Sequence, residues 1–112
     1  MTYGTKYHGT LTSKLKPIVT MLTEALARDF APAYRRVTEG TASLYIRTDE
    51  SGHEDVVDGA QLRKDVENWL LTLEADMTND SDRQFAKMVV NMIRKNPGWV
   101  TLLANRVQKR IR

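Results

Sequence analysis

Hydrophobic residues recur every three or four positions in four separate stretches of this chain. Residues with that spacing lie on one side of an α-helix, so the pattern predicts four amphipathic helices. The four stripes are Leu15, Ile18, Val19, Leu22, Leu26 and Phe30; Leu62, Val66, Trp69, Leu70, Leu73 and Met77; Phe85, Met88, Val89, Met92 and Ile93; and Trp99, Val100, Leu103, Val107 and Ile111.

Local sequence signals place the ends of these helices. Pro17 suits the first turn of a helix, where a missing N–H costs nothing, and residues 31–32 (Ala-Pro) should end that helix. Asp58, followed three positions later by a glutamine, resembles a capping box at the start of the second helix. Residues 78–81 should cap the third helix, and residues 96–98 (Asn-Pro-Gly) should separate it from the fourth.

Between the first and second helices the hydrophobic spacing changes to alternation. Leu44 and Ile46 alternate with Ser43, Tyr45 and Arg47, which is typical of a β-strand. Turn-forming residues on both sides of this segment can reverse the chain. We therefore expect a small antiparallel sheet, either a hairpin or a three-stranded meander, formed by residues 34–37, 44–47 and 53–57.

One helix, a small sheet and three further helices define a mainly helical α+β fold. Residues 1–12 have two glycines and no periodic pattern, so we expect a flexible N-terminal leader before a single domain at 13–112. The chain has no cysteine, but 112 residues can fold around one core without a disulfide. No hydrophobic run approaches the length of a membrane span and no secretion signal is recognisable, which predicts a cytoplasmic protein.

Charge is distributed unevenly along the sequence, although the net charge is only +3. Residues 49–82 contain eleven acidic and two basic residues, whereas residues 83–112 contain eight basic residues and no acidic one. Such segregation is typical of proteins with an acidic or nucleic-acid partner. It can equally arise within one domain, where an acidic helix and basic helices face one another.

The basic C-terminal region is the candidate binding site. We predict that it holds the phosphates of a nucleic acid with Arg94, Lys95, Arg106, Lys109, Arg110 and Arg112. Arg106, Lys109 and Arg110 are spaced to share one face of a helix. The last two helices resemble a helix-turn-helix only loosely, because Asn105 and Gln108 are the only amides near that face. Alternatively, these cations stabilise helix ends and keep the protein in solution.

The predicted sheet also places aromatic residues beside arginines. Such a face could stack bases, but the interpretation that we favour is a solvent-facing hairpin with cross-strand aromatic–arginine pairs. The residues concerned are Tyr34, Arg35, Arg36, Tyr45 and Arg47.

No pattern for a metal site or a catalytic site is convincing. The acidic loop from Asp49 offers oxygen ligands, but Glu54 and Ala60 stand where an EF-hand needs glycine and glutamate. His8 lies in the leader and His53 in a charged turn, where neither is pre-organised as a base. The sequence has no glycine-rich phosphate loop. We therefore predict no metal, no cofactor and no enzymatic activity.

Two functions remain open at this point. In the first, the protein is a nucleic-acid-binding accessory or regulatory module that uses its basic C-terminal helices. In the second, it is a small adaptor or inhibitor that docks on a larger protein, with its segregated charge steering the encounter. Met88 and Met92 share a helical face that suits docking, although core packing is commoner. An amphipathic stripe could also pair two copies as a homodimer.

Overall fold

The computed structural model describes the backbone of residues 2–40, 42–73 and 78–112, and the side chains in these ranges from residue 16 onward. The elements are α1 (Thr2–Asp29), the short 3-10 turn η1 (Ala31–Ala33), β1 (Tyr34–Arg36), β2 (Leu44–Thr48), β3 (Glu54–Asp58), α2 (Gly59–Leu71), α3 (Asp80–Lys95) and α4 (Gly98–Gln108). This order confirms the predicted mainly helical α+β fold.

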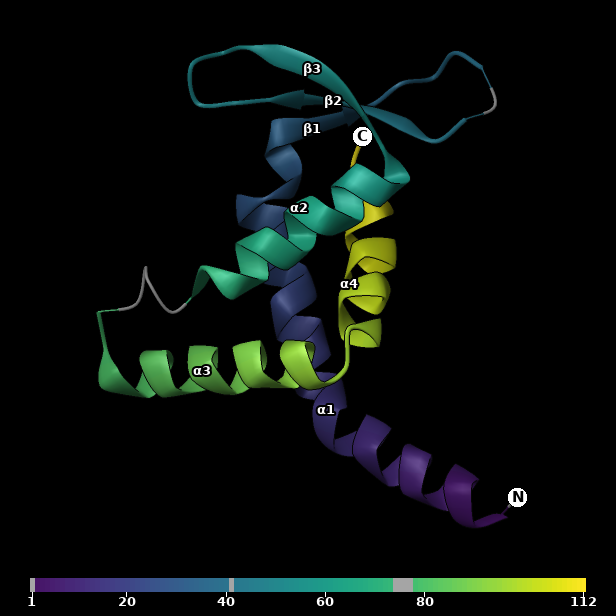
Figure 1. Ribbon diagram of the computed structural model, residues 1–112, viewed down its shortest axis with the longest axis vertical. Coiled ribbons are helices and arrows are strands. Elements are labelled where there is room, and N and C mark those ends of the chain that lie inside the picture. Colours follow the sequence, from purple (N-terminus) through teal and green to yellow (C-terminus); the bar gives the residue numbers. More distant parts are fainter. Residues whose placement is uncertain (1, 41, 74–77) are drawn as a thin grey trace.

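The three strands form an antiparallel sheet in the order β1-β2-β3, so the meander includes its third strand. Tyr45 of β2 lies between Arg36 of β1 and Val57 of β3. Gly52 in the β2–β3 turn has a φ of 87°, which residues with a Cβ rarely adopt. Figure 1 shows the sheet across one end of the helices, and its residues Tyr34, Tyr45 and Val57 join the hydrophobic core.

The first helix is longer than the sequence predicts. α1 begins at Thr2 and contains Pro17 in its interior, so the prediction that Pro17 lies in the first turn is wrong. Residues 2–12 of the stretch assigned to a leader are therefore helical, while the flexibility of that stretch stays a prediction. Figure 1 shows α1 bending between the part within the body and the N-terminal part that extends away. A bend is expected at an internal proline, because it removes one backbone hydrogen bond and crowds the preceding turn.

Polar side chains cap α2 and α3 where the sequence predicts helix starts. The Asp58 carboxylate accepts a hydrogen bond of 2.9 Å from the backbone N–H three residues later, at the start of α2. Asn79 caps α3 by accepting from the Ser81 N–H at 2.8 Å. After α3, the Asn96 side chain accepts from the N–H two residues later at 3.1 Å, and the chain turns into α4.

The hydrophobic core draws residues from every helix and strand. Its largest fully buried side chains are Leu26, Tyr45, Leu62, Val66, Leu70, Val89, Val100, Leu103 and Val107. The buried positions confirm the predicted stripes of α1, α2 and α4, with Ile18, Trp69, Leu73 and Trp99 only partly buried. Leu15 and Met77 of those stripes lie outside the described side chains.

α3 buries most of the predicted stripe but differs at one edge. Val89 and Ile93 are buried as expected, but Met88 is 44% exposed and Val90 is buried. Met88, Val89 and Val90 are consecutive hydrophobic residues, so the helical spacing alone allows either Met88 or Val90 to be buried beside Val89. Packing against the other helices selects the edge with Val90, and Met88 therefore faces solvent.

Replacing Asp58 with alanine should lower the free energy of unfolding by about 1 kcal/mol, because the first turn of α2 loses its side-chain cap. Urea denaturation followed by circular dichroism would measure the change. Asp58→Asn is the matched control, since asparagine caps helices about as well as aspartate and should cost far less. Equal losses for the two variants would show that the carboxylate charge, rather than the cap, stabilises this position.

Candidate nucleic-acid interface

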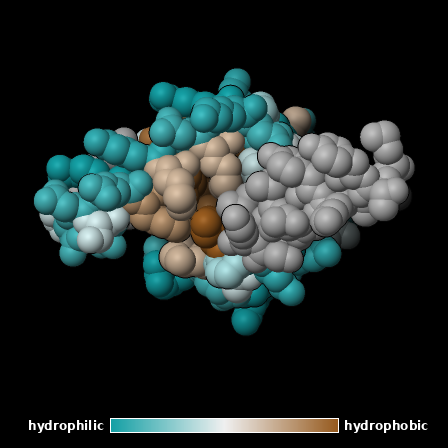
Figure 2. Space-filling model, turned by 90° about the horizontal axis from the view of Figure 1, so that it is seen from below, coloured by the Kyte–Doolittle hydropathy of each residue, from teal (hydrophilic) through white to brown (hydrophobic). Residues whose placement is uncertain are grey.

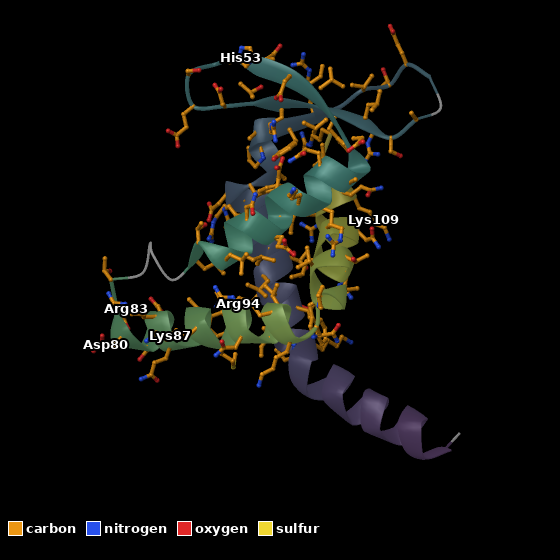
Figure 3. The ribbon with its side chains drawn as sticks, in the orientation of Figure 1. His53, Asp80, Arg83, Lys87, Arg94 and Lys109 are labelled. Carbon is orange, nitrogen blue, oxygen red and sulfur yellow. The ribbon has the colours of Figure 1, made fainter. Side chains whose placement is uncertain are left out.

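The six cations predicted to hold phosphates are all exposed and lie on three parts of the structure. They are Arg94 and Lys95 in the last turn of α3, Arg106 and Lys109 on α4 and at its end, and Arg110 and Arg112 in the C-terminal turn. Figure 3 shows Arg94 and Lys109 far apart along the two helices. Along α4, the eight steps from Gly98 to Arg106 rise about 12 Å, at about 1.5 Å per residue, so Arg106 and the cations after it lie well beyond the start of the helix.

α4 ends at Gln108, so Arg110 lies in the turn beyond the helix rather than on its surface. Its guanidinium forms an ion pair with Glu24 of α1, with 2.5 Å between Nη2 and Oε1. The hydrogen bond and the charge of Glu24 raise the pKa of Arg110. Both side chains are about half exposed, at 47% and 58%, so solvent screens the attraction and an anion can still reach Arg110.

The other five cations make no ion pair with any side chain that the structure describes. The acidic segment finds its partners elsewhere. Arg47 of β2 pairs with Asp55 and Asp65, and Arg35 of β1 pairs with Glu54. The positive charge at the end of α3, on α4 and in the C-terminal turn is therefore largely available to an external anion.

Hydrogen bonds to β1 hold the C-terminal turn in place. The Arg36 backbone N–H donates to the Arg112 carbonyl at 2.7 Å, and the Arg36 guanidinium donates to the Gln108 carbonyl at 2.6 Å. Ile111, between the two terminal arginines, is 4% exposed and belongs to the core. Arg110 and Arg112 are thus carried by an anchored segment. Sequence analysis did not predict this role of Arg36, because Gln108 is 72 positions away.

A pocket of about 450 Å³ lies between the C-terminal turn and the end of α1. Its lining consists of Ala27, Ala31, Pro32, Tyr34, Arg110 and Arg112. No acidic side chain belongs to this lining, and we call it the arginine pocket. Both arginines are among the predicted cations, but the sequence gives no sign that they face η1, because only the fold brings these segments together.

The sheet does not present the stacking face that its composition suggested as an alternative. Tyr45 is fully buried and Tyr34 is 8% exposed, so neither ring is available to a base. Arg36 lies over the Tyr45 ring at 5.6 Å, and the other sheet arginines are engaged in the ion pairs above. The favoured interpretation is confirmed only in part: Arg36 and Tyr45 form a cross-strand aromatic–arginine pair, but both tyrosines face the core rather than solvent.

Asp65 of α2 organises a polar cluster that sequence analysis missed. Its carboxylate accepts hydrogen bonds from the Tyr34 hydroxyl at 2.6 Å, from Arg47 at 2.8 Å and from the Gln61 amide at 2.9 Å. Burial and the bond to Asp65 raise the pKa of Tyr34. The cluster fixes the Tyr34 ring, which forms one wall of the arginine pocket.

Tyr34→Phe should reduce stability, and the deficit should shrink as the pH rises above about 10. The pKa of the Tyr34 hydroxyl is higher in the folded protein than its unfolded value of about 10. Its contribution to the free energy of unfolding is therefore complete below about pH 10 and is lost as the pH rises toward the folded pKa. Urea denaturation of both proteins between about pH 8 and pH 11 would measure the difference. A deficit independent of pH would contradict the assignment. Tyr45→Phe is the control, because the Tyr45 hydroxyl has no partner among the described residues.

The acidic loop forms a turn that the Asp49 carboxylate holds together. The Asp49 carboxylate accepts bonds from the Ser51 hydroxyl at 2.6 Å and from the backbone N–H groups of Ser51 and His53 at 2.9 Å, and the Ser51 bond lowers its pKa. Within the described ranges, no group of three or more histidine or acidic residues is arranged to hold a metal ion. His53 is exposed at this turn (Figure 3).

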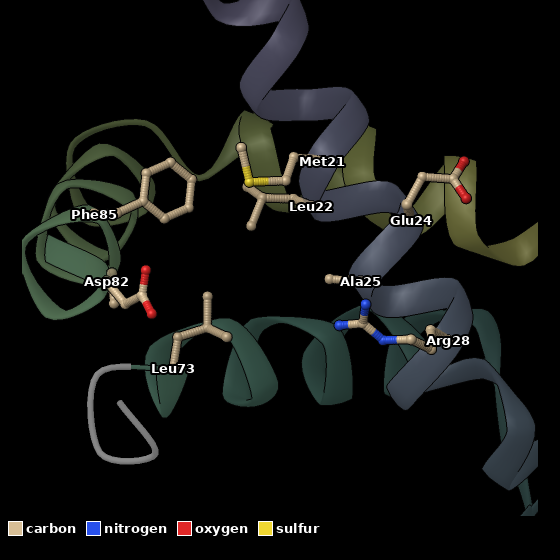
Figure 4. A pocket seen from close by; sticks show the side chains of 9 residues that line it. Met21, Leu22, Glu24, Ala25, Arg28, Leu73, Asp82 and Phe85 are labelled. Atoms are coloured by element: carbon tan, nitrogen blue, oxygen red, sulfur yellow. The ribbon is translucent and has the colours of Figure 1, made fainter. Parts of the chain in front are cut away.

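A second concave surface is hydrophobic and lies between α1, the end of α2 and α3. Figure 4 shows Phe85 and Asp82 of α3 facing Met21 of α1 across an opening, with Leu73 at one end. The cavity has a volume of about 390 Å³, and Met21 is 53% exposed at its edge. Figure 2, seen from the side where α3 lies, shows hydrophobic residues exposed in the middle of that face. We call this surface the Met21 groove.

No helix in the described ranges is both long and hydrophobic enough to cross a lipid bilayer. Comparison with known proteins gives no relative: no protein-family model matches the chain, and neither the curated proteins nor the solved structures contain a significant match.

Proposed function

We propose that this protein is a non-catalytic nucleic-acid-binding module that holds phosphates with the cations of its C-terminal region. The observation that supports this most directly is the exposure of all six predicted cations, five of which have no ion pair in the described structure. Arginine and lysine side chains in that state can neutralise phosphates and release the counterions condensed on the nucleic acid, which contributes much of the affinity. An accessory or regulatory role fits a module of this kind.

Contact between six cations and a duplex gives a strong dependence on salt. The logarithm of the binding constant should fall with the logarithm of salt concentration with a slope of about −5. Affinity should then decrease by roughly 10³-fold between about 50 and 200 mM salt. Fluorescence anisotropy of labelled duplex DNA, single-stranded DNA and RNA at several salt concentrations would measure this slope for each form.

Removing the two α4 cations should weaken binding without unfolding the protein. In the double variant Arg106→Gln with Lys109→Gln, the salt slope should become smaller by about 2, because two phosphate contacts are lost. The matched control is Arg35→Gln with Lys64→Gln, which removes the same residue types from exposed positions on β1 and α2. Circular dichroism would verify that both variants are folded.

A folded α4 variant that binds like the unchanged protein would refute the assignment of the site. Equal weakening by the control variant would mean that binding is only a general attraction between a basic protein and a polyanion. Binding seen only at low salt would have the same meaning, and the function would then have to be sought in a protein partner.

The Met21 groove favours the second candidate function, a small adaptor or inhibitor that docks on a larger protein or on another copy of this chain. A partly exposed methionine beside Phe85 and Leu22 offers an adaptable hydrophobic contact. Met21→Asp should abolish a stoichiometric complex that survives nuclease treatment. Met88→Asp is the control, because Met88 is similarly exposed but does not line the groove. Loss of the complex in both variants, or in neither, would count against this groove.

A further inference from the structure

We propose that the arginine pocket binds the terminal phosphate of a nucleic-acid strand, with Arg110 and Arg112 as its ligands. This inference rests on the proposed function and assigns a separate task to two of its six cations. The other cations lie on open surface, where the continuous backbone of a strand can pass. The two terminal arginines face a concave site instead.

The shape of the pocket favours a strand end over an internal phosphate. A backbone phosphate diester has chain on both sides, so it binds most easily on an open surface. The pocket is bounded by the end of α1, by η1 and by the C-terminal turn, and a group at the end of a strand can enter it. Its volume of about 450 Å³ lies within the range of about 300–1,000 Å³ that is usual for small-ligand sites. A terminal nucleotide therefore has room there.

The chemistry of the lining fits the same group. Guanidinium groups are planar donors whose N–H groups match the oxygens of a phosphate. The two positive charges of a pair of arginines can balance a phosphate monoester, which carries about −1.5 to −2 at neutral pH. A diester carries a single negative charge and would use this pair less fully. The other lining residues, Ala27, Ala31, Pro32 and Tyr34, carry no charged group and leave room for the sugar of a terminal nucleotide.

The pocket is also pre-organised. Ile111 is buried between the two arginines, and the Arg36 N–H holds the Arg112 carbonyl at 2.7 Å. Tyr34 is fixed by its hydrogen bond to Asp65. A site that is already ordered loses less conformational freedom on binding, which favours affinity and selectivity.

Glu24 gives the site a property that a simple basic patch would lack. Its carboxylate is bonded to Arg110 at 2.5 Å and competes with a phosphate for that guanidinium. Glu24→Gln removes the negative charge while keeping a side chain of the same size. This substitution should tighten binding of the phosphorylated end several-fold, whereas Arg110→Gln should weaken it.

The test compares two forms of one single-stranded DNA of about eight nucleotides, labelled at the 3′ end, with either a phosphate or a hydroxyl at the 5′ end. Fluorescence anisotropy at physiological salt should show about tenfold tighter binding of the phosphorylated form. The double variant Arg110→Gln with Arg112→Gln should remove that preference. The matched variant Arg106→Gln with Lys109→Gln should weaken both forms and keep the preference.

Each outcome separates the inference from the proposed function. Equal affinity for both forms would overturn the terminal-phosphate site and leave nucleic-acid binding intact. Binding of the phosphorylated form alone would support the pocket and contradict general backbone binding. Absence of binding by both forms would overturn both proposals. A phosphoserine peptide that binds as tightly as the phosphorylated DNA would overturn the assignment to a strand end.

Discussion

Leu70→Ala should lower the free energy of unfolding by about 3–5 kcal/mol, the largest loss that we expect from a single hydrophobic truncation in this protein. Leu70 is fully buried on α2 and belongs to the hydrophobic core, and α2 packs most extensively on α4. Truncation removes the buried methyl groups and leaves a cavity that a rigid helical framework cannot close. Since small domains are stable by only about 5–15 kcal/mol, much of the folded population is at risk at physiological temperature.

Urea denaturation followed by circular dichroism would measure this loss. Leu102→Ala is the matched control, because the same atoms are removed from a partly buried position on α4 and should cost considerably less. Similar losses for Leu70→Ala and Leu102→Ala would show that the degree of burial does not determine how much each side chain contributes to stability. A loss below about 1 kcal/mol for Leu70→Ala would mean that α2 packs by another face.

The elements of the fold could be predicted because their signals are local. Asp58 and Asn79 cap helices through N–H groups only two or three residues away, and the turn at Asn96 is equally short in range. Alternation around Leu44 and Ile46 identified the central strand of the sheet. Signals of this kind act within a few residues, so the sequence contains them before any tertiary contact forms.

The failed predictions concern choices that tertiary contacts make. Pro17 is compatible with a first helical turn and with a bent helix interior, and nothing local decides between them. The hydrophobic run at 88–90 allows two buried edges, and packing selects Val90. Trp69 shares the stripe of Leu70 but lies at its edge, where a large ring remains partly exposed.

For the candidate site, too, the sequence predicts which residues carry the charge but not their surroundings. Counting charges identified the six cations, since the absence of acidic residues after Asp82 is visible in the sequence. Their environment was not predictable, because Arg110 meets Glu24 across 86 positions and Arg36 holds the C-terminal turn across 72. The arginine pocket exists only because α1, η1 and the C-terminal turn converge.

Asp65→Ala should lower the free energy of unfolding by about 3 kcal/mol, the largest loss that we expect from a polar substitution. The Asp65 side chain is 12% exposed and accepts hydrogen bonds from Tyr34, Arg47 and Gln61. Alanine leaves these three donors without their shared acceptor, and partly buried donors that lose a charged partner are costly. Thermal or urea denaturation would measure the loss.

Asp55→Ala provides the matched control, because Asp55 is the other carboxylate bound to Arg47 but is 42% exposed. Arg47 then keeps Asp65, and water replaces the lost partner, so the change in stability should be much smaller. Asp65→Asn should fall between the two, since its amide oxygen can still accept from the Tyr34 hydroxyl while the negative charge is gone. If Asp55→Ala were the more damaging substitution, the exposed Arg47–Asp55 pair would contribute more stability than the Asp65 cluster. Tyr34 would then have to be held mainly by the stacking of its ring on Phe30, whose ring centroid lies 4.6 Å away, instead of by Asp65.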